Sequence, residues 1–385
     1  MNNTALSADQ PRGRAWLATG ALGISAFAIV TSELAPVGML QALAQTFQQT
    51  AAQTGQVVTV YGWVAALAAL LSVALPARIS RKTLLVTLML LLALASLAAA
   101  QAPGFPLFMA ARLAGAIAHG VFWALIGSVA VQLVPAEKLG RATAVIFGGV
   151  SAASVLGVPL ASYLAAVTGW REAFTVISLL ALVTACALLR TLPALAPSAA
   201  QPLRSCGPLL KNPRLLAVYA ATACIISAHF AAFTYVEPLL RDVRHVPAAM
   251  IAALLLVSGL AGLAGNVIAG RLIDRHLKPL VCFALLTGAA ALGTLALSFA
   301  MPLWLTGALL AVWGAGMAIV FVGLQTLLLR RAGAQTAAAS ALYVAVFNAA
   351  IGSGALAGGV LLTMIGLPHM VLLAAVIIAA AIALL

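Results

Sequence analysis

Two residues of opposite charge, Glu33 and Arg112, lie inside long apolar stretches of the sequence, where ionisable side chains are costly. A helix rises about 1.5 Å per residue, so Glu33, counted from Gln41, and Arg112, counted from Phe105, lie about 10 to 12 Å below the same end of their helices. A carboxylate and a guanidinium at one depth can form an ion pair, and separating them changes how readily the carboxylate binds a proton. We interpret both residues as candidates for proton coupling; the alternative is a structural pair that fixes helix packing.

The segment RLAGAIAHGVFW, residues 112–123, carries a stripe of residues that can bind a small ligand. Arg112, Gly115, His119 and Trp123 are spaced so that they share one face of a helix. His119 lies near the middle of its apolar stretch, where it can form hydrogen bonds or exchange a proton, so it is a third proton-coupling candidate. Trp123 offers a flat apolar face beside it. The alternatives are an interhelical hydrogen bond for His119, and packing or an interfacial anchor for Trp123.

Further polar and aromatic residues lie inside other apolar stretches, where they can bind a ligand or bridge helices. Asn266 shares a stripe with Gly259 and Gly262, which favours close helix contact as its alternative role. Glu237 lies near the end of its stretch, where water can solvate it. Together with His119 and Trp123, the ligand-binding candidates are Tyr61, His229, Phe233, Glu237, Asn266, Gln325 and Asn348.

The composition indicates the elements that position these residues. Hydrophobic residues make up 64% of the chain and charged residues only 7%, with a mean hydropathy of +1.15, so a soluble globular protein is excluded. Long apolar runs without alternation predict helices, because a backbone N–H or C=O group that lacks a hydrogen bond is costly inside a membrane and a helix pairs these groups internally. The sequence therefore predicts an all-α integral membrane protein with about twelve transmembrane helices. The predicted spans are 16–41, 55–77, 83–102, 105–133, 141–167, 171–192, 214–240, 247–271, 279–300, 303–329, 337–363 and 367–385.

The net charge of +13 follows from membrane topology rather than from nucleic-acid binding. When the N-terminus is placed in the cytoplasm, most of the 20 Lys and Arg residues fall on the inner side of the membrane, and Arg112 alone lies within it. The positive-inside rule therefore predicts a multi-pass protein of the bacterial inner membrane with a cytoplasmic N-terminal tail, residues 1–15.

Short similar segments recur in two halves of the chain. TSELAP at 31–36 matches TYVEP at 234–238, and the loops ARISRK and GRLIDRH follow corresponding spans. A Pro- and Ala-rich stretch, residues 193–213, separates the halves and is typical of a linker. We expect two pseudo-symmetric six-helix bundles, residues 16–192 and 214–385, joined by a cytoplasmic linker.

Several of these motifs resemble those of the major facilitator superfamily over essentially the whole chain. GRLIDR at 270–275 resembles its loop signature, and RLAGAIAHG at 112–120 resembles its fourth-span pattern. More narrowly, TSELAPVGML, AHGVFWALI and HFAAFTYVEPLL are similar to segments of bacterial sugar efflux transporters of the arabinose efflux type, in the twelve-span drug:proton antiporter group. The chain departs from the pattern at Ser80, where a carboxylate is expected, and at GVP (157–159), where a Gly-Pro pair is expected.

The resemblance implies two bundles that rock around a site near the middle of the membrane, with export of a sugar or sugar-like molecule by proton antiport. An indole that packs on a sugar face while imidazole and amide groups bind its hydroxyls fits such a site. We expect a monomer in the lipid bilayer, without cofactor, metal or nucleic acid. A conformational latch is expected at the cytoplasmic end of the eighth span, where the negative charge of Asp274 can interact with the positive N-terminus of a helix. The latch residues are Gly270, Arg271, Asp274 and Arg275.

The sequence is also compatible with other functions. Nucleosides or amphipathic drugs such as chloramphenicol are alternative substrates for the same mechanism. An intramembrane enzyme is disfavoured because the sequence has no Gly-x-Ser-x-Gly segment and no paired metal-ligand motif. A channel is disfavoured because a channel needs a continuous polar lining, which this sequence does not provide. The 4 cysteines show no disulfide or metal-ligand spacing.

Overall fold

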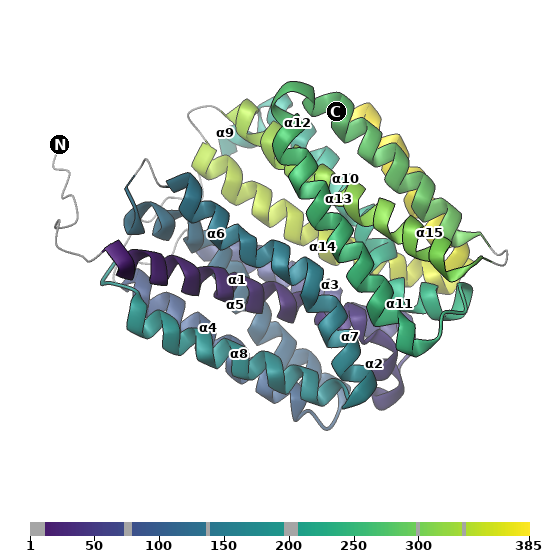
Figure 1. Ribbon diagram of the computed structural model, residues 1–385, viewed down its shortest axis with the longest axis horizontal. Coiled ribbons are helices and arrows are strands. Elements are labelled where there is room, and N and C mark those ends of the chain that lie inside the picture. The colour runs from purple at the N-terminus through teal and green to yellow at the C-terminus, as the bar shows by residue number, and fades with distance from the viewer. Residues whose placement is uncertain (1–11, 73–78, 136–138, 196–206, 298–300, 333–335) are drawn as a thin grey trace.

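The computed structural model describes the chain except for residues 1–11, 73–78, 136–138, 196–206, 298–300 and 333–335. Every regular element of the described residues is a helix, and twelve helical segments are long and apolar enough to cross a membrane (Figure 1). Each of the twelve corresponds to a predicted span, so the prediction of an all-α protein with twelve spans is confirmed. The spanning segments are Gly13–Gly38, Ala51–Ser72, Arg81–Ala100, Phe105–Ile126, Gly148–Val167, Trp170–Thr191, Pro213–Phe233, Ala248–Ile273, Arg275–Ala296, Leu303–Ala332, Ala338–Ile365 and Leu367–Leu384.

Local sequence accounts for the places where these helices begin and end. The Ser80 hydroxyl accepts a hydrogen bond from the backbone N–H of Thr83 at 3.1 Å and so caps the helix that starts at Arg81. Asn212 caps the helix that starts at Pro213 in the same way, through Arg214. The elements are α1 (Arg12–Gly38), α2 (Leu40–Phe47), α3 (Ala51–Ser72), α4 (Arg81–Ala100), α5 (Phe105–Leu133), α6 (Leu139–Ala152), α7 (Val158–Val167), α8 (Trp170–Thr191), α9 (Gly207–Leu210), α10 (Pro213–Phe233), α11 (Val236–Pro238), α12 (Ala248–Ala296), α13 (Leu303–Ala332), α14 (Thr336–Ile365) and α15 (Leu367–Ala380).

Two spans are interrupted in ways that the sequence explains. Pro159 lacks a backbone N–H, and a π-helical turn, Ala153–Gly157, precedes it between α6 and α7. In α12 the backbone leaves the helical region at His276, with φ −130° and ψ 38°, so this long element comprises two spans that meet at a kink.

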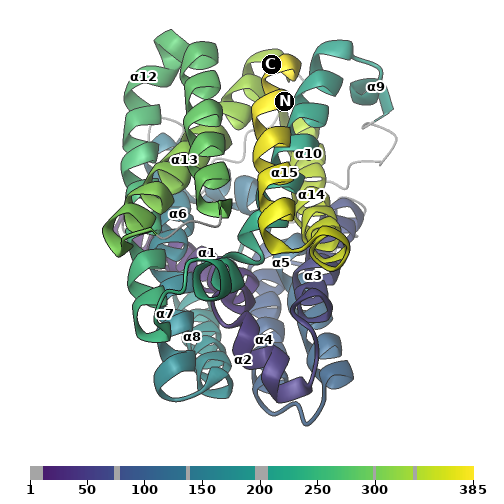
Figure 2. The same ribbon diagram turned by 90° about the vertical axis from the view of Figure 1, so that its right-hand side faces the viewer.

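The helices pack into a first half, residues 12–195, and a second half, residues 207–385. In the first half α4 packs on α5 and α8, and α1 packs on α6 and α8; in the second half α12 packs on α13, and α10 packs on α14 and α15. Figures 1 and 2 show the helices of the first half, coloured purple to teal, gathered on one side of those of the second half, whose colours run from the teal of α9 and α10 to yellow. The halves meet where α3 lies against α14 and α7 against α12, a surface that we call the seam.

Among the described residues, two side chains of the second half contact the first half at one end of the helices, which we call the Gln41 end. There Glu237 binds the backbone of Gln41, and the Tyr235 ring fills the space beside Gly55. At the opposite end, which we call the Arg214 end, the hydrogen bonds of Lys82 and Arg331 stay within one half. Of these side-chain contacts in the described residues, those that join the two halves lie at the Gln41 end.

The orientation in the membrane is a testable prediction from the distribution of basic residues. We expect Lys278, at the Arg214 end, to face the cytoplasm, and Ala248, at the Gln41 end, to face outside; both are exposed. In a chain whose native cysteines are replaced, an impermeant thiol reagent added to intact cells should label Ala248→Cys and spare Lys278→Cys. Labelling of position 278 but not 248 would reverse the topology.

Candidate functional site

Glu33 and Arg112 lie close together inside the first half, which their common predicted depth allowed. Both are buried, with 7% and 4% of their surfaces exposed. The guanidinium of Arg112 donates to the Ser32 hydroxyl at 3.1 Å and to the main-chain carbonyl of Glu33 at 3.4 Å. The Glu33 carboxylate instead approaches His119, with 3.8 Å between Oε2 and Nδ1. The two charges are thus neighbours, but the contact runs through the main chain because the carboxylate points toward His119.

Tyr61 of α3 covers the stripe that begins at Arg112. The guanidinium carbon of Arg112 lies 4.3 Å from the centre of the Tyr61 ring. The ring meets His119 edge-on at 5.5 Å, and its hydroxyl donates to the Gly115 carbonyl at 3.4 Å. Tyr61 therefore joins the ionisable residues of α1 and α5 into one buried group, which we call the ionisable cluster: Ser32, Glu33, Tyr61, Arg112 and His119.

The stripe on α5 continues from His119 to Trp123, whose rings lie 6.3 Å apart. Trp123 is half-buried, so it borders the ionisable cluster rather than belonging to its interior. The helical spacing of Arg112, Gly115, His119 and Trp123 thus produced the common face that the sequence predicted.

Three nitrogen and oxygen atoms of the ionisable cluster are buried without a hydrogen-bond partner: Glu33 Oε1, Arg112 Nε and His119 Nδ1. Leaving a buried polar atom unpaired costs about 1 to 3 kcal/mol, and more for a charged group. Such a cost is common at sites whose groups bind a proton or a ligand during their working cycle. The arrangement therefore has the chemical capacity for proton binding.

The second half presents a group of rings around His229, which is 7% exposed. Phe233 stacks on the imidazole at 5.3 Å and 17°, while Trp313 and Phe321 meet it edge-on at 5.3 and 5.6 Å. Phe347 extends the group through Phe321 at 5.5 Å. We call these five residues the aromatic cluster.

Sequence reasoning selected His229 and Phe233 but missed Trp313, Phe321 and Phe347. Trp313 and Phe321 both lie on α13 and differ by eight positions, which places them on one helical face. The signal was present, but aromatic residues in an apolar span are common core residues and did not stand out. The Trp313 Nε1 and the His229 Nδ1 are buried without a hydrogen-bond partner, which distinguishes this cluster from an ordinary core.

Asn348 of α14 lies at the seam between the two clusters. It is 5% exposed, its amide donates to the Val344 carbonyl at 2.9 Å, and its side chain interacts with His119. Its Oδ1 has no hydrogen-bond partner. The predicted candidate Asn348 is thus placed where both halves can contact a common ligand.

The other predicted residues lie elsewhere. Asn266 is half-buried on α12, and Gln325 is exposed on α13. Glu237 is buried at the seam, where Oε2 accepts a hydrogen bond from the Gln41 backbone N–H at 2.8 Å. Gly270, Arg271 and Arg275 are exposed near the Arg214 end, whereas the Asp274 side chain lies outside the described residues.

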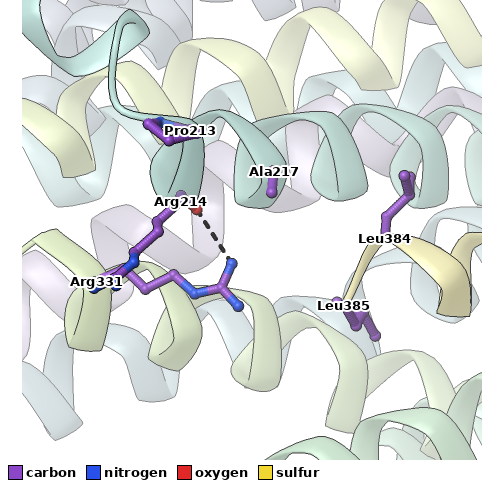
Figure 3. Close-up of a pocket in the computed structure, with 6 residues that line it drawn as sticks. All are labelled: Pro213, Arg214, Ala217, Arg331, Leu384 and Leu385. Carbon is purple, nitrogen blue, oxygen red and sulfur yellow. Dashed lines mark hydrogen bonds between the residues drawn. The ribbon is translucent and has the colours of Figure 1, made fainter.

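A hollow of about 560 Å³ opens at the Arg214 end, between Pro213, Arg214, Arg331 and Leu385 (Figure 3). None of the predicted ligand-binding residues lines it. Among the described residues there is no group of three or more His, Cys, Asp or Glu side chains that could hold a metal ion.

Comparison with known proteins identifies the fold. The family model of the Major Facilitator Superfamily matches residues 22–354. A bacterial homolog of the human lysosomal transporter Spinster, solved in an inward-facing and unoccupied conformation, superposes with a TM-score of 0.77 at 13% identity, covering 98% of this chain and 97% of its own. The nucleoside transporter NupG gives 0.78 at 15% identity (96% and 99%), and the human organic anion transporter MFSD10 (TETRAN) gives 0.72 at 16% (98% and 100%).

Proposed function

Since this chain belongs to the major facilitator superfamily, we propose that it is a secondary active transporter that exports a sugar or sugar-like molecule in exchange for protons. In this proposal residues 16–192 and 214–385 form the two bundles, and 193–213 link them in the cytoplasm. The protein works as a monomer in the bacterial inner membrane, with residues 1–15 in the cytoplasm and the Gln41 end outside. The similarity of TSELAPVGML and related segments to sugar efflux transporters of the drug:proton antiporter group supports the direction.

The observation that carries the proposal is the Glu33 carboxylate, buried 3.8 Å from His119 and beside the Arg112 guanidinium. When Glu33 is ionised, its charge offsets that of Arg112; when it is protonated, Arg112 is left as an uncompensated buried charge. The two protonation states therefore favour different arrangements of the helices around them. A proton taken up in one arrangement and released in the other drives substrate in the opposite direction.

The substrate, in this proposal, binds at the seam between the ionisable cluster and the aromatic cluster. His119 and Asn348 provide hydrogen-bonding groups for hydroxyls, and Asn348 has an unpaired Oδ1. The aromatic cluster offers apolar ring faces, on which the C–H face of a sugar packs. A site with few polar groups and several aromatic walls suits a small, partly apolar, hydroxylated ligand.

A nucleoside or an amphipathic drug is the second candidate, because the rings around His229 can equally stack on a base or an aromatic drug. A sugar should depend on the hydrogen bonds of His119 and Asn348, whereas a drug should tolerate their loss. The discriminating experiment is efflux of labelled pentoses, disaccharides, nucleosides and chloramphenicol from loaded cells, with and without a protonophore. Protonophore-sensitive efflux of sugars supports the proposal. If none of these compounds is exported, the proposal is contradicted.

Substrate binding provides a prediction for the α5 stripe. His119→Ala and Trp123→Ala should each weaken binding by roughly 1 to 2 kcal/mol, because one removes a hydrogen-bonding group and the other an apolar ring face. The measurement is calorimetric titration of the purified protein with the substrate found in the efflux panel. Trp304→Ala is the matched control, since Trp304 is 72% exposed on α13 and away from both clusters. Unchanged binding in both test variants would assign the stripe to packing.

A further inference from the structure

Glu237 belongs to neither cluster and connects the two halves directly. It lies on the short helix α11, beyond the end of the α10 span, and is 9% exposed. Its Oε2 accepts a hydrogen bond from the backbone N–H of Gln41, in the first turn of α2 in the other half, at 2.8 Å. The α2 N-cap residue, Met39, supplies no side-chain hydrogen bond. A carboxyl group of the second half therefore caps a helix of the first.

From this bridge we propose that Glu237 is a second proton-binding site, separate from Glu33, and that it binds its proton as the halves close at the Gln41 end. The bridge exists only while α11 lies against α2, so it forms on closure and breaks on opening. The neighbouring Tyr235 supports the same contact: its ring fills the space beside Gly55 of α3, and its hydroxyl donates to the Ala355 carbonyl of α14 at 3.1 Å.

The charged groups around Glu237 leave it free to become neutral. Arg241, one turn later, donates a hydrogen bond from one terminal nitrogen to Oε1 at 3.4 Å. Its Nε and its other terminal nitrogen bind the two oxygens of Asp242 at 2.8 and 3.1 Å, so its charge is shared between two carboxylates. Across the seam, the described residues of the first half that act on the carboxyl group are the uncharged backbone amides of Leu40 and Gln41. A protonated Glu237 still accepts the Gln41 hydrogen bond through its carbonyl oxygen, and Arg241 keeps its two hydrogen bonds to Asp242.

Burial gives the sign of the pH dependence. Removal from water raises the pKa of Glu237, and the hydrogen bond from Gln41 and the charge of Arg241 offset this only in part. With the seam open, water restores the ordinary value. The closed state therefore binds the proton more tightly than the open state. Between the ordinary carboxyl pKa of the open state and the raised pKa of the closed state, a fall in pH favours closure and a rise in pH favours opening. The closed-to-open ratio changes by up to about tenfold for each pKa unit between the states.

Closure favoured by protons fits the proposed antiport. The inference rests on the proposed function only in requiring that the seam opens. A carrier that has released its substrate outside must close at that end before it returns. Protons outside then favour the closing step at Glu237, while Glu33 carries the transported proton.

The test is the distance between two spin labels at the Gln41 end, measured across a pH series without substrate. Gln45→Cys on α2 and Ala248→Cys on α12 are exposed positions on opposite halves. The parent protein should show more of the short distance at low pH. Glu237→Gln, which keeps the acceptor but cannot ionise, should show mainly the short distance at every pH. Glu237→Ala, which removes the acceptor, should lose that population.

Glu172→Gln is the matched control, because Glu172 is an exposed carboxylate in the first turn of α8 at the same end, within one half. It should behave like the parent protein. A Glu237→Gln protein that keeps the parent pH dependence, or that shifts toward the long distance, would overturn the proposal. Because no substrate is present, failure of the proposed transport activity would leave this result unaffected.

Discussion

Glu33→Gln is expected to lose substrate movement driven by a pH gradient while it retains substrate exchange across the membrane. The amide has nearly the shape of the carboxyl group but cannot ionise, so the Arg112 charge is never offset and the proton-linked step is lost. Binding persists because the aromatic cluster and Asn348 are unchanged. The measurement compares uptake into proteoliposomes under an imposed pH gradient with counterflow in its absence.

Glu172→Gln serves again as the control, since it removes a carboxylate that lies in the outermost turn of α8 and touches neither cluster. It should transport at the parent rate in both assays. Gradient-driven uptake by Glu33→Gln at the parent rate would remove Glu33 from the mechanism and leave His119, His229 or Glu237 as coupling residues.

Gly62→Val is expected to slow transport by opposing closure of the two halves on each other. A Cβ atom at Gly62 would lie 2.7 Å from both the Asn348 carbonyl oxygen and the Gly352 backbone nitrogen of α14. These are backbone atoms at the seam, which cannot turn aside as a side chain can, so α3 and α14 must separate. Overpacking of this kind costs about 1 to 3 kcal/mol, which corresponds to a loss of closed state of roughly five- to 150-fold.

Counterflow in proteoliposomes measures the loss, and circular dichroism with size-exclusion chromatography shows whether the variant is folded. Gly20→Ala is the matched control, because Gly20 is also a helical glycine but a Cβ atom there meets nothing within 4 Å. It should transport normally. A folded Gly62→Val protein with parent counterflow would show that α3 and α14 need not touch during the cycle.

The helices were predictable from the sequence because membrane spans require long unbroken apolar runs, and those runs also set the depth of residues within them. Equal depth made a contact between Glu33 and Arg112 possible, although depth alone does not show which helices are neighbours. Helical spacing was enough to place His119 and Trp123 on one face. Both properties depend on position along a single helix, which the sequence contains.

Side-chain direction was not predictable in the same way. The Glu33 carboxylate turns toward His119, and Arg112 reaches the Glu33 main chain instead, because Ser32 and Tyr61 occupy the space around the guanidinium. Gln325 lies inside a span but is exposed. Its exposure was not predictable, because depth along a helix does not reveal how that helix is rotated against its neighbours. Rotation and partner choice arise from packing between helices.

The most direct test of proton coupling through Glu33 is the simultaneous recording of substrate and protons in proteoliposomes of the parent protein. An outward substrate gradient is imposed without a pH gradient, and a pH-sensitive dye trapped in the lumen reports the lumen pH. Proton coupling through Glu33 predicts that the lumen acidifies as substrate leaves. Proteoliposomes with Glu33→Gln should show no net substrate efflux and no acidification of the lumen. Substrate efflux by the parent protein with no change in lumen pH would contradict this coupling.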